Sequence, residues 1–195
     1  MRLERRQIIA FLSGRLSEAR LNHCLRVEEV ALQLAERFDA PTELVSPAAL
    51  LHDVCREEPP DLLLKLASKF GIVISDIERA EPLLLHGAVG AALLREEWGF
   101  TEPTVLEAVT YHITGAPRLS PLAKLVFVAD AIEPGRNYPR AQQLREEALQ
   151  VAPDRLLLHI YDQTITYLIK EKYRIHPRTV AARNELLKKG VISLS

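Results

Sequence analysis

The chain has 195 residues, with 25 basic and 26 acidic side chains and a formal net charge of -1 at pH 7. This length favours one domain, and the balanced charge argues against a nucleic-acid-binding protein, which usually carries a strong basic excess. Two cysteines cannot build a disulfide framework, and no apolar run approaches the roughly 18 residues that a membrane span needs. We therefore expect a cytoplasmic protein with neither nucleic acid nor membrane as a partner.

Apolar residues recur at helical spacing along nearly all of the chain. Ser17 is a predicted N-cap, and Ser46 with Pro47 is read as an N-cap followed by the first residue of a helix. Only residues 71–75 look strand-like, and one short strand cannot make a sheet. The predicted helices begin near residues 17, 46, 60, 82, 103, 121, 153 and 177.

These patterns predict an all-α fold, with residues 1–195 forming a single domain. The fold is expected to be a bundle of about seven to nine helices. Its core is expected at about residues 18–135, followed by C-terminal helices at about residues 136–190. A helical surface of this kind could form a homodimer, although the sequence does not fix the oligomeric state.

Histidines and aspartates occupy positions that should face the interior of this bundle. Four of the six histidines lie in apolar contexts on four different predicted helices. Asp53 and Asp130 each follow an apolar run that ends a helix or continues its buried face. The four inward histidines are His23, His52, His86 and His112.

Together these six side chains predict a transition-metal site. A buried carboxylate costs several kcal/mol unless a cation compensates it, and the inward faces carry no comparable supply of Lys or Arg. Neutral imidazoles with ionised carboxylates are the ligand set of Zn, Mn, Fe, Co or Ni. Because neighbouring residues on a helix point about 100° apart, His52 and Asp53 reach one ion only if their helix ends at the site.

Each of these residues alone has a simpler interpretation. A single inward histidine is more often a hydrogen-bonded core residue, and Asp130 alone could cap the next segment. His159 is interpreted as structural and His176 as a turn residue, both outside the pattern. Cys24 is one step round its helix from His23, so we expect it to face elsewhere rather than to be a thiolate ligand.

The order of these residues resembles a known signature. His23, then His52 with Asp53, then Asp130 look like the signature of the HD-domain metal-dependent phosphohydrolases, an all-helical superfamily. Five segments and the closing HPRTVAARN are similar to the YqeK-like family of bacterial symmetrical bis(5'-nucleosyl)-tetraphosphatases, over about residues 20–185. The five segments are HCLRVEEVALQLAERF, AALLHDVCRE, LLHGAVGA, YHITG and VADAIEPGR.

The resemblance implies a metal-dependent phosphoanhydride hydrolase with an HD-type helical bundle. Such an enzyme would cleave diadenosine tetraphosphate symmetrically to two ADP by means of a metal-bound hydroxide. It also implies a dinuclear transition-metal centre, described as di-iron in this family, with Mn, Co, Ni and Zn left open. In that centre His23, His52, Asp53 and Asp130 hold the first ion, His86 and His112 hold the second, and Asp53 bridges the two.

The catalytic candidates are Asp53 and Arg56. Arg56 stands where many HD proteins carry Lys, and since a guanidinium stays protonated, it suits phosphate binding better than proton donation. Four residues beside the ligands are candidate substrate contacts. They are Arg26, Arg56, Thr114 and Arg136.

Other functions remain open at this point. The same ligand set would serve an HD phosphohydrolase of another nucleotide, such as a nucleoside mono- or triphosphate, because substrate choice depends on the pocket walls. A non-catalytic nucleotide-binding regulatory domain is a second alternative, and a purely structural bundle is a third.

Overall fold

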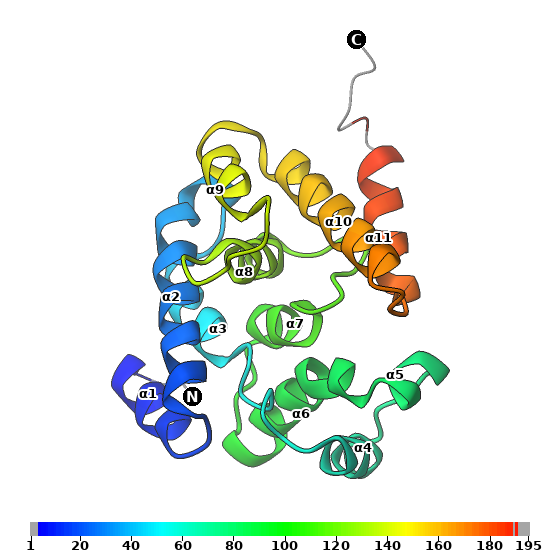
Figure 1. The fold of residues 1–195 in the computed structure, drawn as a ribbon. Coiled ribbons are helices and arrows are strands. Elements are labelled where there is room, and N and C mark those ends of the chain that lie inside the picture. The colour runs from blue at the N-terminus through cyan, green and yellow to red at the C-terminus, as the bar shows by residue number, and fades with distance from the viewer. Residues whose placement is uncertain (1–3, 189, 191–195) are drawn as a thin grey trace.

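The computed structural model describes residues 4–188 and 190, and within these residues it contains α-helices, two short 3-10 helices and no strand (Figure 1). The prediction of an all-α fold is confirmed. The elements are α1 (Arg5–Ser13), α2 (Glu18–Leu34), η1 (Glu36–Phe38), α3 (Thr42–Leu51), α4 (Pro60–Lys69), α5 (Asp76–Ala80), η2 (Pro82–Leu85), α6 (His86–Trp98), α7 (Pro103–Tyr111), α8 (Pro121–Ile132), α9 (Ala141–Gln150), α10 (Pro153–Lys170) and α11 (Pro177–Lys188).

Most predicted helix starts are confirmed. The Ser17 hydroxyl accepts a hydrogen bond from the backbone N–H of Arg20 at 3.2 Å and so caps α2. Prolines open α4, α7, α8 and α10, where the missing N–H costs no helical hydrogen bond. Gly99 ends α6 in a left-handed conformation with φ 60°.

Two local predictions were wrong. The helix that carries Leu50 begins at Thr42, so Pro47 lies inside it, and the Ser46 hydroxyl donates to the Glu28 carboxylate at 2.5 Å instead of capping. The segment 71–75 is not a strand, because Gly71 ends α4 with φ 68° and Ser75 caps α5. Together with α1, α5 and α9, which were not predicted, the described residues form eleven α-helices rather than seven to nine.

The centre of the bundle is built by α7 and α8 (Figure 1), which pack against each other, with α2 and α3 on one flank and α6 against α7. The contact of α6 with α7 is close because Gly87 has no side chain. A Cβ atom there would lie 2.7 Å from the carbonyl oxygens of Val109 and Thr110. This close approach brings the start of α6, where His86 lies, against the end of α7, where His112 lies.

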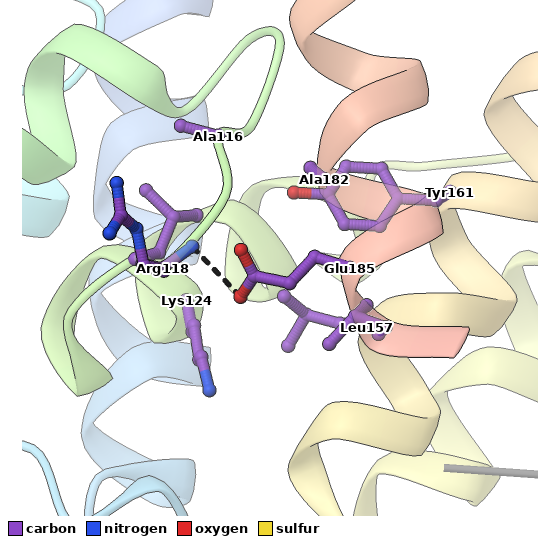
Figure 2. Close-up of a pocket in the computed structure, with 9 residues that line it drawn as sticks. Ala116, Arg118, Lys124, Leu157, Tyr161, Ala182 and Glu185 are labelled. Carbon is purple, nitrogen blue, oxygen red and sulfur yellow. Dashed lines mark hydrogen bonds between the residues drawn. The ribbon is translucent and has the colours of Figure 1, made fainter. Parts of the chain in front are cut away.

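The loop after α7 is fixed to the two C-terminal helices. Gly115 has φ 64°, and a Cβ atom there would lie 1.9 Å from the Tyr161 hydroxyl of α10, so only glycine fits. The Arg118 backbone N–H donates to Glu185 of α11 at 3.1 Å, as Figure 2 shows. The void between these residues measures about 10 Å³, which is room for about one water molecule. Among the described residues, no helix is both long and apolar enough to cross a membrane.

Candidate metal centre

The predicted histidines and aspartates meet where several helices end. His52 directly follows α3, His86 is the first residue of α6, and His112 directly follows α7. The expectation that the helix carrying His52 and Asp53 stops at the site is therefore confirmed. His23 differs from these three histidines because it lies inside α2. The four histidines are at most 5% exposed.

Three of these histidines orient their rings in the same way. Where a helix ends, a backbone carbonyl can accept a hydrogen bond from a side chain, and the Nδ1 atom of each ring bonds the carbonyl of the residue three positions earlier. Because a carbonyl can only accept, Nδ1 carries the proton and the Nε2 lone pair faces the centre. The pairs are His52 with Ala49 at 2.7 Å, His86 with Leu83 at 2.6 Å, and His112 with Val109 at 2.7 Å.

His23 has no such carbonyl, because the helix interior uses it. Its Nδ1 atom instead donates to the Glu133 carboxylate at 3.1 Å. Glu133 is 2% exposed, and it also accepts from Arg26 Nε at 2.5 Å and from the Gly135 N–H at 2.6 Å. These three donors offset burial and lower the pKa of Glu133. The Nε2 atom of His23 therefore also faces the centre.

The first group of inward atoms contains His23, His52 and one oxygen each of two aspartates. The two Nε2 atoms are 3.3 Å apart, and His23 Nε2 lies 3.1 Å from Asp130 Oδ1. His52 Nε2 lies 3.4 Å from Asp53 Oδ2 and 3.9 Å from Asp130 Oδ1. His23, His52 and Asp130 form a group that could hold a metal ion.

The second group contains His86, His112 and the other oxygen of Asp53. Asp53 Oδ1 lies 3.0 Å from His86 Nε2 and 3.3 Å from His112 Nε2, and these two nitrogens are 3.0 Å apart. The two oxygens of Asp53 thus face different pairs of histidines. His52, Asp53 and His112 also form a group that could hold a metal ion.

The chemistry of these atoms fits metal ions. With every Nδ1 protonated, the Nε2 atoms of His86 and His112 point their lone pairs at each other and at a carboxylate, and such a cluster of acceptors repels itself unless a cation joins it. An ion about 2.1 Å from two ligand atoms holds them about 3.0–3.4 Å apart at angles of about 90–109°. The separations in the second group match this geometry. In the first group the two longest separations, 3.6 Å from His23 Nε2 to Asp53 Oδ2 and 3.9 Å from His52 Nε2 to Asp130 Oδ1, exceed it.

The pKa values of the buried groups follow from their burial and from the charges around them. Burial lowers the pKa of His86, so its ring is neutral at pH 7. Burial alone would raise the pKa of Asp53, but the neighbouring imidazoles, His52 first, outweigh burial and the pKa is lowered. Burial also lowers the pKa of His52, which the negative charge of Asp53 reverses into a net increase.

The expectation that the aspartates have no arginine partners was wrong. Arg20 Nη1 donates to Asp53 Oδ2 at 2.9 Å, and Arg136 pairs with the Asp130 carboxylate. Arg20 was missed, although it precedes His23 by three residues and so shares its helix face. Each arginine bonds the carboxylate oxygen that also faces the first group, Asp53 Oδ2 and Asp130 Oδ1. The histidine nitrogens of both groups remain acceptors.

A cavity of about 880 Å³ opens onto the centre. Asp53, Asp130 and the candidate contacts Arg56 and Arg136 line it together with Arg20, His86 and His112. The structure does not bring the other two candidate contacts to this cavity. Arg26 is held by Glu133, and Thr114 is buried with its hydroxyl donating to the Gly115 carbonyl at 2.9 Å.

The remaining histidines and the cysteines lie outside both groups. His159 Nδ1 bonds Glu147 at 2.6 Å and so joins α10 to α9, and His176 accepts from the Arg178 N–H just before α11. Cys24 and Cys55 are fully buried, and burial raises the pKa of each thiol, that of Cys55 to about 12. Neither thiol is a thiolate at pH 7.

Comparison with known proteins agrees with the fold. The HD domain family model matches residues 20–135. The structure superposes with a TM-score of 0.91 on the crystal structure of a predicted HD superfamily hydrolase involved in NAD metabolism from Clostridium acetobutylicum. That protein is 31% identical, and the match covers 97% of this chain and all of that chain.

Three curated relatives that share one name define a narrower group of similar proteins. A symmetrical bis(5'-nucleosyl)-tetraphosphatase of Staphylococcus aureus is 34% identical over 87% of this chain and 88% of its own length. Enzymes of the same name from Halalkalibacterium halodurans and Bacillus subtilis are 32% and 29% identical, each over 95% of this chain and 98% of its own length. The chain therefore belongs to the HD domain family, in the same group as these phosphatases, and this membership implies a divalent metal ion.

Proposed function

We propose that this protein is a metal-dependent hydrolase that cleaves diadenosine tetraphosphate at its central anhydride and releases two ADP. The names of the three curated relatives support the substrate and the symmetrical cleavage. The observation that carries the proposal is the position of Asp53, whose two oxygens face two different histidine pairs at the wall of a cavity of about 880 Å³. Cavities of this size hold small-molecule ligands.

In this proposal the centre is dinuclear, with iron as the first candidate and Mn, Co, Ni and Zn as alternatives. His23, His52 and Asp130 would hold one ion, His86 and His112 the other, and Asp53 would bridge them. When bound, the ions would lower the pKa of a water molecule toward neutrality, and their positive charge would stabilise the phosphoryl oxygens.

The protein's own groups would hold the metal ligands and bind the phosphate chain. The backbone carbonyls and Glu133 keep each imidazole in the tautomer whose Nε2 faces inward, so little reorganisation is needed on binding. Arg20, Arg56 and Arg136 line the cavity, where guanidinium groups pair with phosphate oxygens in bidentate fashion. Arg56 is not needed as an acid, because ADP leaves as a diphosphate, which is a good leaving group without a proton donor.

The test is the identity of the products. Full-length protein loaded with Fe, and in parallel with Mn or Co, is incubated with diadenosine tetraphosphate, and the nucleotides are resolved by ion exchange. ADP as the sole product is expected. ATP together with AMP would contradict symmetrical cleavage. No turnover of this substrate by metal-loaded protein that hydrolyses nucleoside mono- or triphosphates would contradict the proposed substrate.

Four narrower predictions accompany this function. We propose a cytoplasmic location, no nucleic-acid partner, and a boundary near residue 136 between the HD core and the C-terminal helices. A homodimer is also proposed, and sedimentation of the purified protein would measure it.

A further inference from the structure

The cavity extends well beyond the metal centre along one face of α10. Ile160, Thr164, Tyr167, Leu168 and Glu171 line it, at the spacing of a single helix face. Eleven residues at about 1.5 Å per residue span about 16 Å. The wall becomes more exposed toward the helix end, from 2% at Ile160 to 50% at Tyr167. The cavity therefore has an inner end at the metal centre and an outer end at the last turn of α10.

Two tyrosines form the outer end. The rings of Tyr167 and Tyr173 lie with their centroids 6.2 Å apart at an interplanar angle of 50°. They are 50% and 60% exposed, and both line the cavity. Large aromatic rings exposed side by side in a cavity wall are a common feature of ligand sites.

The turn after α10 places Tyr173 on Tyr167. Lys172 adopts a left-handed conformation with φ 58°, which glycine usually supplies at this position. The Tyr173 N–H then bonds the Leu168 carbonyl at 2.9 Å, and the Lys172 N–H bonds the Ile169 carbonyl at 3.1 Å. This pattern folds the chain back over the last turn of the helix. These backbone hydrogen bonds therefore hold the backbone of Tyr173 beside the last turn of α10.

Charged side chains of both signs accompany the rings, because Glu81 and Glu171 line the cavity together with Lys170 and Arg174. Lys170 and Arg174 line the same end of the cavity, and Arg174 Nη1 bonds Glu81 Oε1 at 2.8 Å across it. Aromatic rings beside cations are how proteins bind nucleotides without selecting the base, since each base stacks through its flat face and the cations follow the phosphates.

We infer that Tyr167 and Tyr173 bind the base of the second nucleoside of a dinucleoside tetraphosphate. The inference rests on the proposed function, because it places the scissile anhydride at the metal centre. It adds a determinant of specificity at the far end of the cavity, which favours substrates with a nucleoside at both ends of the phosphate chain.

The experiment compares the double variant Tyr167→Ala/Tyr173→Ala with the unmodified metal-loaded protein. Base stacking on an aromatic side chain predicts a rise of about tenfold in KM for diadenosine tetraphosphate, with kcat within about twofold. The Ki of inorganic tetraphosphate, which has the phosphate chain but no base, should not change. The double variant Tyr167→Phe/Tyr173→Phe keeps the rings and should restore KM.

The matched control is Ile169→Ala. Ile169 lies on the same helix and is 63% exposed, but it is not part of the cavity wall, so KM should stay unchanged. The inference is overturned if the double alanine variant keeps its KM, if Ile169→Ala raises KM equally, or if inhibition by tetraphosphate weakens in parallel. It is also overturned if the tyrosine variants change only the oligomeric state, which would assign the rings to a protein contact. If the unmodified protein does not cleave the dinucleotide, the proposed function fails and this inference fails with it.

Discussion

The two ends of the cavity are built in opposite ways. At the inner end, Asp53, His52 and His112 are almost completely buried, and each ring is fixed by a hydrogen bond on its outward nitrogen. At the outer end, Tyr167 and Tyr173 are at least half exposed. The inner end brings acceptor atoms together and requires a cation. The outer end exposes flat aromatic rings and charged side chains to solvent.

Because of this difference, we expect the inner end to carry out the chemistry and the outer end to recognise the substrate. Buried groups with fixed orientation bind ions strongly and tolerate few substitutions, because an unpaired buried polar group costs about 1–3 kcal/mol. Exposed rings and cations contribute smaller, independent increments. We therefore expect substitutions at the inner end to abolish metal binding and turnover. Those at the outer end should change only substrate affinity.

The largest effect is expected for Asp53→Asn. The variant keeps the size of the side chain but presents only one oxygen, so the two histidine groups no longer share a carboxylate. A loss of about 4 kcal/mol of transition-state stabilisation, or about a thousandfold in kcat/KM, is expected. Steady-state assays with diadenosine tetraphosphate measure it, with circular dichroism to confirm folding. A folded variant within tenfold of the unmodified enzyme would contradict the role of Asp53.

A smaller effect is expected for Glu133→Gln. The amide cannot fix the tautomer of His23 as the carboxylate does, so metal affinity should fall by about 10- to 100-fold. Activity should recover at high metal concentration, which a purely structural defect would not allow. The control is Glu28→Gln, since Glu28 is equally buried on α2 but pairs with Arg5 away from the centre. Equal losses of metal affinity in both variants would remove the distinction.

The smallest of these effects is expected for Arg20→Gln. Arg20 lines the cavity and bonds Asp53, so its loss should raise KM for a tetraphosphate substrate by about tenfold through one lost phosphate contact. Arg15→Gln is a matched control, because Arg15 is similarly exposed and pairs with Glu58 outside the cavity. An unchanged KM in Arg20→Gln, with normal metal content, would exclude Arg20 from substrate binding.

The sequence predicted the inner end better than the outer end for a physical reason. His23, Asp53 and Asp130 are polar residues on or directly after apolar helical runs, and several such residues together are unusual enough to be recognised. Glu133 was missed because a glutamate after a helix normally faces solvent. Its burial depends on Arg26 and on the Gly135 N–H, which only the folded chain brings together.

The outer end depends on tertiary structure. Tyr167 and Tyr173 lie on and just beyond a helix whose exposed face gives no signal, and their pairing follows from the left-handed turn at Lys172. A glycine usually marks such a turn in a sequence, whereas here the residue is a lysine. Arg26 and Thr114 were selected because they are close to ligands in sequence, but their side chains point to other partners. Closeness in the chain does not specify which way a side chain faces.

The claim that two histidine groups share Asp53 is tested most directly by counting metal ions. Protein purified without chelator is analysed for metal content, together with Asp53→Asn and His112→Ala. We expect two ions per chain in the unmodified protein, about one in His112→Ala, and fewer than one in Asp53→Asn. Less than one ion per chain in the unmodified protein, or a content that neither substitution changes, would contradict the proposed centre.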